Sequence, residues 1–311
     1  MKLLLVCLLF LTACTLTGNV IIEPVVENNK PLEVYFCPQE DCKTILIDFI
    51  QSAQKSVDCA FFDLSMEEVI GALEEKNARI FIDGDYTLAF PRVRYDTKSQ
   101  LSHNKFCVVD RKKVLTGSFN PTTTKNYNNM VILYSKYLAK NYQDEFDELW
   151  SGTNGGGEAV SYPVIKLNNH TVENYFCPED NCAEHIIKIL RTAKKSIYFM
   201  QYSFTHDGIG DSLVERFNAG VDVKGIFESS QNNKYTEYTA LQAAGIQVQW
   251  DNQPILLHHK VFIIDEKIVV TGSMNPSKNG DENNDENVVI IHDREVARKF
   301  VDEFLRAEQM S

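Results

Sequence analysis

The sequence lacks an excess of positive charge. Its 311 residues include 31 lysines and arginines against 43 aspartates and glutamates, so the formal net charge is −12. A surface of this sign repels polyanions. The composition therefore argues against a protein that coats nucleic acid nonspecifically and with high affinity.

Long apolar runs are also missing: apart from the N-terminal segment, no stretch of the sequence is long and apolar enough to cross a bilayer. The N-terminus has Lys2, an apolar run over residues 3–11 and small residues before Cys14, a layout that is typical of secretory signals and similar to that of bacterial lipoproteins. We expect residues 1–13 to be a signal peptide, Cys14 to carry a lipid, and residues 14–30 to form a tether. The protein would then be exported and held at the extracytoplasmic face of the cell membrane. Another cleavage site, or an uncleaved anchor helix, is the alternative.

Six cysteines follow the N-terminal segment. Two matching units, FCPQEDC and FCPEDNC, contain Cys37, Cys42, Cys177 and Cys182. In an exported protein a local disulfide within each unit is the simplest interpretation, and a zinc site shared by all four thiolates is the alternative. Cys59 and Cys107 fall in apolar runs, where we expect core residues, with a further disulfide as the alternative.

With 44% hydrophobic residues, the chain can bury a sizeable core in one large domain or two ordinary ones. The segments that begin at LEVYFCPQEDC and VENYFCPEDNC follow the same order of amphipathic helix, strand, helix, strand, hairpin and final helix. This alternation predicts an α/β fold of two similar repeats, each a mixed β-sheet flanked by helices. We assign residues 31–151 to the first repeat, 152–163 to a Gly-rich linker and 164–311 to the second repeat.

The two repeats differ ahead of the hairpin. Residues 236–250 of the second repeat predict an extra helix and strand, whereas we expect residues 85–100 of the first to be an extended loop. This loop interleaves basic and aromatic residues: Phe90, Arg92, Arg94, Tyr95 and Lys98. Such a loop could stack on and attract a nucleic-acid strand, and an ordinary solvated loop is the alternative.

A polar pattern occurs twice within apolar hairpins, in LSHNKFCVVDRKKVLTGSFNPT (101–122) and LLHHKVFIIDEKIVVTGSMNPS (256–277). Both copies keep His, Lys, Asp and Gly-Ser-x-Asn at the same spacing: His103, Lys105, Asp110, Gly117, Ser118, Asn120 and His258, Lys260, Asp265, Gly272, Ser273, Asn275. A hairpin alone does not need polar residues at fixed places, so the pattern indicates a function.

Strand geometry sorts these residues. Side chains alternate between faces, so His258 and Lys260 share a face while His259 points away, and Asp265 has the opposite parity, as expected for a structural residue. Ammonium and carboxamide groups suit the non-bridging oxygens of a phosphate, and an imidazole can attack phosphorus or transfer a proton. Two facing copies would place two histidines on opposite sides of one phosphodiester, with one proton shared between them.

The doubled pattern resembles that of the phospholipase D superfamily over about residues 30–311. The resemblance implies two repeats packed as a pseudo-twofold fold, a phosphohistidine intermediate resolved by water or an alcohol, and no metal ion or other cofactor. Because both half-sites lie in one chain, we expect a monomer. We assign catalytic roles to His103, Lys105, Ser118, Asn120, His258, Lys260, Ser273, Asn275 and Glu286. Structural roles go to Asp110, Asp265, Gly117 and Gly272. The usual order of two-motif chains makes His103 the nucleophile and His258 the acid.

Glu286 lies where the superfamily often has a carboxylate that orients a catalytic histidine; a solvated loop acid or part of a calcium loop is the alternative. Aligning NNMVIL with ENVVII places Asn128 at the matching position of the first repeat. An amide can accept from an imidazole N–H but cannot stabilise imidazolium by charge, so the two histidines should differ in basicity. The other histidines lack the pattern and should be surface or packing residues: His170, His185, His206 and His292. For His206, a place in the lining of the cleft is the alternative.

The expected activity is phosphodiester hydrolysis on a phospholipid or a nucleic acid. Small size, the absence of accessory lipid-binding modules and the basic loop favour a nuclease. The expected tether favours a phospholipase, and the net charge disfavours a nuclease. Phosphatidyl transfer, or a surface protein that binds phosphate esters without turnover, is the alternative.

Overall fold

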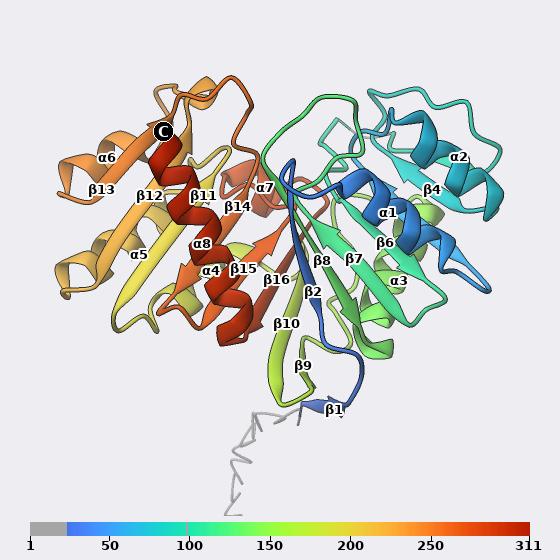
Figure 1. The fold of residues 1–311 in the computed structure, drawn as a ribbon, viewed down its shortest axis with the longest axis horizontal. Coiled ribbons are helices and arrows are strands. Elements are labelled where there is room, and N and C mark those ends of the chain that lie inside the picture. The colour runs from blue at the N-terminus through green and yellow to red at the C-terminus, as the bar shows by residue number, and fades with distance from the viewer. Residues whose placement is uncertain (1–23, 98) are drawn as a thin grey trace, which may run out of the picture.

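The computed structural model describes residues 24–97 and 99–311, and their strands form two mixed sheets (Figure 1). The expected signal peptide, Cys14, most of the expected tether and Lys98 lie outside the described residues. Each sheet is flanked by helices, which confirms the predicted α/β fold of two similar repeats. The residue boundaries of these units stay predictions.

The first sheet belongs to the first repeat. Its strand order is β2 (Glu33–Cys37), β8 (Asn128–Tyr134), β7 (Lys113–Gly117), β6 (Phe106–Val109), β3 (Val57–Phe61), β4 (Arg79–Ile82) and β5 (Val93–Tyr95). Its helices are α1 (Cys42–Gln51), α2 (Glu67–Glu75) and α3 (Lys136–Ser151). The doubled motif begins just before β6 and ends just after β7, so it occupies the centre of the sheet.

The second sheet repeats this order and adds strands at its edge. It runs β1 (Val25–Glu27), β9 (Val164–Leu167), β10 (His170–Cys177), β16 (Glu286–His292), β15 (Ile268–Gly272), β14 (Lys260–Ile264), β11 (Ser196–Gln201), β12 (Asp222–Glu228) and β13 (Gln247–Asp251). Its helices are α4 (Cys182–Leu190), α5 (Asp207–Asn218), α6 (Tyr238–Ala243), α7 (Lys278–Glu282) and α8 (Arg294–Met310). Because β1 pairs with β9, the end of the expected tether is already part of the fold.

Residues 236–250 form a helix and a strand as predicted, α6 and β13. The prediction for residues 85–100 was wrong in one respect, because this segment contains β5. Strand β5 pairs in parallel with β4 in the same way as β13 pairs with β12. The strand is therefore common to both repeats, and a three-residue strand at a sheet edge is too short to show a period in the sequence.

Alternating side chains divide the strands between different cores. In β6, Phe106 and Val108 face the central core, where α3 and α8 pack, while Cys107 and Val109 face the core under α1 and α2. The central core contains apolar side chains from both repeats. Burial of these shared side chains holds the two sheets together.

Disulfides form within both local units, joining Cys37 to Cys42 and Cys177 to Cys182 as predicted. Their thiols are thereby unavailable to a shared zinc site, so that alternative was wrong. A further disulfide links Cys59 in β3 to Cys107 in β6, two fully buried residues opposite each other in the sheet. In residues 24–97 and 99–311, no helix is both long and apolar enough to cross a bilayer.

Candidate active site

The two repeats meet where each motif begins. The N–H of His103 donates to the carbonyl of Asp285 at 2.9 Å, and the N–H of His258 donates to the carbonyl of Tyr127 at the same distance. Each contact is part of a short parallel bridge between one motif and the strand start of the other repeat. The next residue along each of these strands, Glu286 or Asn128, therefore lies beside the histidine of the opposite repeat.

Glu286 follows Asp285 and contacts His103. Both carboxylate oxygens lie 2.8 Å from Nδ1 of His103, and both side chains are buried. In the other half-site, Nδ1 of His258 lies 2.8 Å from Oδ1 of Asn128 and 3.1 Å from the carbonyl of Ser118. The acid and the amide thus occupy equivalent places, each on the histidine of the other repeat.

The motif lysines are fully buried beside their histidines. Nζ of Lys105 donates to the carbonyl of His103 at 2.7 Å, and Nζ of Lys260 donates to that of His258 at 2.9 Å. Besides burial, which has the larger effect, the charges of Lys105 and Lys260 each lower the pKa of both histidines. The two half-sites therefore form one electrostatic unit.

An aromatic ring that the sequence pattern did not predict packs against each histidine. The ring centroid of Phe62 lies 4.9 Å from that of His103, and the ring of Tyr202 lies 4.8 Å from that of His258. Both rings also lie under the ammonium group of the adjacent lysine, at 5.2 Å in the first half-site and 4.8 Å in the second. Both aromatic residues come directly after equivalent strands, β3 and β11, and this shared place was a usable signal.

The motif serines hold the histidine partners in place. Oγ of Ser118 donates to Oδ1 of Asn128 at 3.1 Å, and the hydroxyl of Ser273 hydrogen bonds the Glu286 carboxylate. Within the described parts of the chain, the side-chain oxygens of Asn120 and Asn275 are buried without a hydrogen-bond partner. The serines are thus committed to protein groups, whereas the two asparagine oxygens are not.

Gly117 and Gly272 adopt positive φ angles of 145° and 139°. A Cβ at either position would lie 2.2 Å from a backbone oxygen of the neighbouring strand, that of Asn129 or Asn287. Only glycine fits both the φ angle and the close approach. These residues let the chain turn after β7 and β15 and bring Ser118 and Ser273 to the histidine partners.

Asp110 and Asp265 lie at the far end of each hairpin. Asp110 accepts hydrogen bonds of 2.6–3.1 Å from three consecutive backbone N–H groups, those of residues 54–56, and Asp265 accepts bonds of 2.7–3.1 Å from those of residues 194–196. Burial opposes ionisation, yet these donors hold the pKa of both carboxyl groups below the ordinary value. The aspartates fasten the hairpins to the preceding segments and are remote from the imidazoles.

Burial dominates the electrostatics of the site. It lowers the pKa of His103 and His258 well below 6.5, lowers that of Lys105 to about 7, and raises that of Glu286 to about 8. Burial and the neighbouring ammonium group of Lys105 also lower the pKa of Lys260. Since the imidazoles, ammonium groups and carboxyl group compete for few protons, an anionic group that enters this site would favour the charged forms of the lysines.

The other predicted residues lie apart from this centre. His259 points away from the site as expected, towards Asn129 and Glu303 at 3.2 Å each. His206 accepts from the N–H of Ile209 and caps α5. The remaining three make surface or packing contacts: His170 with Asp293, His185 with Tyr175, and His292 with Glu173.

The arginines of the basic loop are held by the fold. The guanidinium of Arg94 lies 4.6 Å from the ring centroid of Trp150 and donates to the carbonyl of that residue, and Arg92 donates to the carbonyl of Asn77 at 2.7 Å. These contacts account for both side chains without a nucleic acid.

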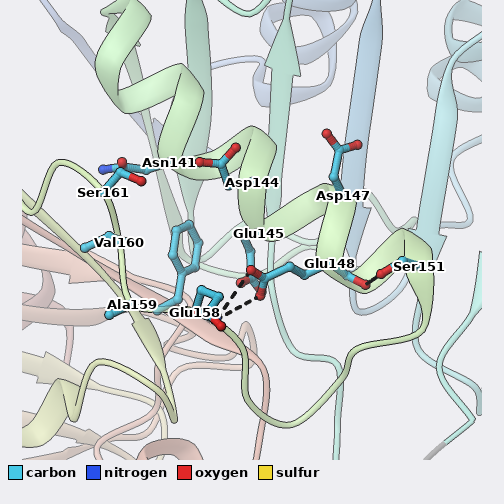
Figure 2. A pocket seen from close by; sticks show the side chains of 11 residues that line it. Asn141, Asp144, Glu145, Asp147, Glu148, Ser151, Glu158, Ala159, Val160 and Ser161 are labelled. Atoms are coloured by element: carbon cyan, nitrogen blue, oxygen red, sulfur yellow. Dashed lines mark hydrogen bonds between the residues drawn. The ribbon is translucent and has the colours of Figure 1, made fainter.

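Figure 2 shows a separate pocket beside α3 that contains none of the motif residues. Its lining includes Glu145 and Glu148, and the latter accepts from the N–H of Glu158 at 3.3 Å. The carboxylates make this pocket unsuitable for an anionic phosphodiester.

Comparisons with known proteins agree with this geometry. The family model for the cardiolipin synthase, PLD-like domain matches residues 88–150 and 186–307. A phospholipase D of Rickettsia bellii is 34% identical over 145 residues, covering 46% of this chain and 72% of the relative. The human (Homo sapiens) mitochondrial cardiolipin hydrolase is 30% identical over 128 residues, covering 41% of this chain and 51% of that protein.

A solved structure shares the fold across both repeats. The phosphatidylserine synthase of Haemophilus influenzae superposes with a TM-score of 0.68 at 12% identity, covering 89% of this chain and 86% of that one. At this identity the likeness concerns the fold alone. The family model and the relatives show that the chain belongs to the phospholipase D superfamily and is a hydrolase of its PLD-like phosphodiesterase family.

Proposed function

We propose that the protein hydrolyses phospholipid phosphodiesters by two successive displacements, with His103 as the nucleophile and His258 as the acid. The observation that carries the assignment is the unequal pairing of the two histidines. A carboxylate lies against Nδ1 of His103, whereas an amide oxygen lies against Nδ1 of His258.

In the first step Nε2 of His103 forms a bond to phosphorus while the bond from phosphorus to the leaving oxygen breaks. The proton shared between His103 and Glu286 then stays on Nδ1, so the carboxylate balances the positive charge of the phosphorylated ring. His258 donates its Nε2 proton to the leaving alkoxide. Its amide partner, Asn128, does not hold that proton by charge, which makes the imidazolium a stronger acid.

In the second step water attacks the phosphorus and the bond to His103 breaks. His258, now neutral, accepts a proton from the water, so both histidines return to their starting states. Lys105 and Lys260, with the amides of Asn120 and Asn275, stabilise charge on the non-bridging oxygens. These side chains supply the positive charge that the reaction needs, so we propose that it requires no metal ion.

Phospholipid is the favoured substrate for two reasons. The relatives are named phospholipase D and cardiolipin hydrolase. The negative charges of Asp63 and Asp83 also reach the first half-site, where both raise the pKa of Lys105 against the effect of burial. Together with the net charge of −12, they disfavour a long polyanion as substrate. We further propose that the protein works as a monomer, exported and held to the membrane by a lipid on Cys14.

The test uses the full chain in detergent with EDTA, incubated separately with phosphatidylcholine vesicles and with single-stranded DNA. His103→Ala and His258→Ala are the inactive variants, and His170→Ala, at a partly exposed histidine that contacts Asp293, is the matched control. Choline release that is lost in the first two variants and kept in the third supports the proposal.

Other outcomes contradict it in distinguishable ways. Cleavage of DNA with vesicles spared makes the protein a nuclease, and dependence on an added metal ion removes the proposed mechanism. No phosphatidic acid in water alone, with phosphatidylbutanol formed once butanol is added, indicates a transferase. Vesicle binding without any product indicates a binding protein.

A further inference from the structure

A buried carboxylate lies behind each catalytic histidine at equivalent places in the two repeats. Asp83 comes directly after β4, and Glu228 is the last residue of β12. Strand β4 pairs in parallel with β3 as β12 does with β11, so the two acids end corresponding strands. Their residues are 3% and 2% exposed, which is rare for acids without a specific role.

Each carboxylate accepts two backbone hydrogen bonds. Asp83 accepts from the N–H of Ser102 at 2.8 Å and from that of Asp85 at 3.1 Å. Glu228 accepts from the N–H of Leu257 at 2.7 Å and from that of Ser230 at 2.8 Å. One bond of each pair therefore goes to the residue that immediately precedes a motif histidine.

These N–H groups have no place in the hairpin ladders. Strand β6 begins only at Phe106 and β14 only at Lys260, so the backbone at residues 102–103 and 257–258 lies outside both. The histidine N–H groups bond to the other repeat, and the preceding N–H groups bond to the acids. Each histidine backbone is thus fastened on one side by the opposite repeat and on the other by a carboxylate of its own repeat.

We infer that Asp83 and Glu228 are positioning residues that fix the backbone of His103 and His258 and so align both imidazoles with the phosphorus. The inference rests on the proposed function. A shift of the backbone at either histidine would move Nε2 away from the line of attack or departure, and misplacement of about 1 Å is enough to reduce rates strongly.

The two acids differ in their effect on charge. Burial lowers the pKa of Lys105, and the charge of Asp83 partly offsets this effect. The charge of Glu228 instead adds to the burial that raises the pKa of Tyr202. Neutralising Asp83 should therefore disturb both the geometry and the titration of the first half-site. Neutralising Glu228 should disturb the geometry alone.

The experiment compares Asp83→Asn and Glu228→Gln with wild type in the vesicle assay, over the pH range 5 to 9. We expect kcat to fall at least tenfold in both variants with KM within a factor of about two. The alkaline limb reflects loss of the protons of both His258 and Lys105. It should move to lower pH in Asp83→Asn, because Lys105 loses its proton more easily, and stay in place in Glu228→Gln. Asp222→Asn, an exposed acid at the start of β12, is the control and should behave as wild type.

The outcomes separate this inference from the proposed function. No activity in the wild type overturns the proposed function. Active wild type, inactive His103→Ala, and unchanged kcat in both acid variants overturn the positioning role. If the amide variants do not fold, Asp83→Glu and Glu228→Asp keep the charge and displace the oxygens; a reduced kcat with an unshifted pH profile supports the inference, and wild-type kcat contradicts it.

Discussion

The carboxylate of Glu286 lies 2.8 Å from Nδ1 of His103, although the two residues are 183 positions apart and belong to different repeats. The contact exists because the strand that starts at Glu286 pairs, one residue earlier, with the beginning of the first motif. The reciprocal contact brings Asn128 to His258. Neither half-site is therefore complete without the other repeat, and the two histidines are electrostatically distinct.

Replacing Glu286 with glutamine should lower kcat about 100-fold. The amide can still accept from Nδ1 of His103, but it does not balance the charge of the phosphorylated ring. Initial rates in the vesicle assay measure the effect, and Glu282→Gln, at an exposed acid of α7, is the control. A kcat within twofold of wild type would show that the carboxylate is dispensable.

Replacing Asn128 with aspartate should extend activity to higher pH. Burial lowers the pKa of His258, and a carboxylate at 2.8 Å would raise it, by at least about one unit. Because His258 must be protonated to donate, the alkaline limb of the kcat profile should move upwards, while the rate at its plateau falls because the acid is weaker. A profile that moves to lower pH, or does not move, would contradict the assignment of His258 as the acid.

Replacing Tyr202 with alanine should reduce kcat about tenfold, because the ring at 4.8 Å confines the imidazole of His258. Tyr202→Phe should keep nearly full activity, since phenylalanine, as Phe62, serves the equivalent place beside His103. Both variants are measured at one pH with thermal unfolding recorded in parallel. A strong loss in Tyr202→Phe would instead give the phenol hydroxyl a role in the reaction.

Replacing Glu179 with glutamine should stabilise the protein at pH 8 and leave it nearly unchanged at pH 5. The carboxyl groups of Glu179 and Glu145 bond each other across the repeats, and burial raises the pKa of Glu179 to about 7. A raised pKa favours folding where the group is protonated, so this contribution is present below about pH 4.5 and is lost as the pH rises through 7. The equivalent residue of the first repeat is already glutamine: Gln39 donates to Glu303 at 3.0 Å.

Thermal unfolding at the two pH values tests this prediction. The gain at pH 8 should be about 1–3 kcal/mol. Glu74→Gln, at an exposed acid of α2, is the control and should give no such gain. Equal effects of Glu179→Gln at both pH values would mean that the two carboxyl groups do not share a proton.

Much of the site was accessible from the sequence because strand geometry is local. The period of two placed His258 and Lys260 on one face, with His259 and Asp265 away from it, and the structure has this arrangement. The matching Cys units predicted local disulfides because the paired residues are only five positions apart in the sequence. Repetition of the pattern further indicated a site made of two halves.

What the sequence by itself determined was the two-repeat α/β fold, the superfamily, and which residues of each motif share a face. Tertiary structure alone decided which repeat supplies the partner of each histidine, because alignment matches Asn128 with Glu286 without saying which histidine either one contacts. It also decided that Asp83 and Glu228 support the histidine backbone, since their bonds connect separate strands. Spacing along a strand fixes the direction of a side chain, but its partner across an interface depends on how two folded sheets pack together.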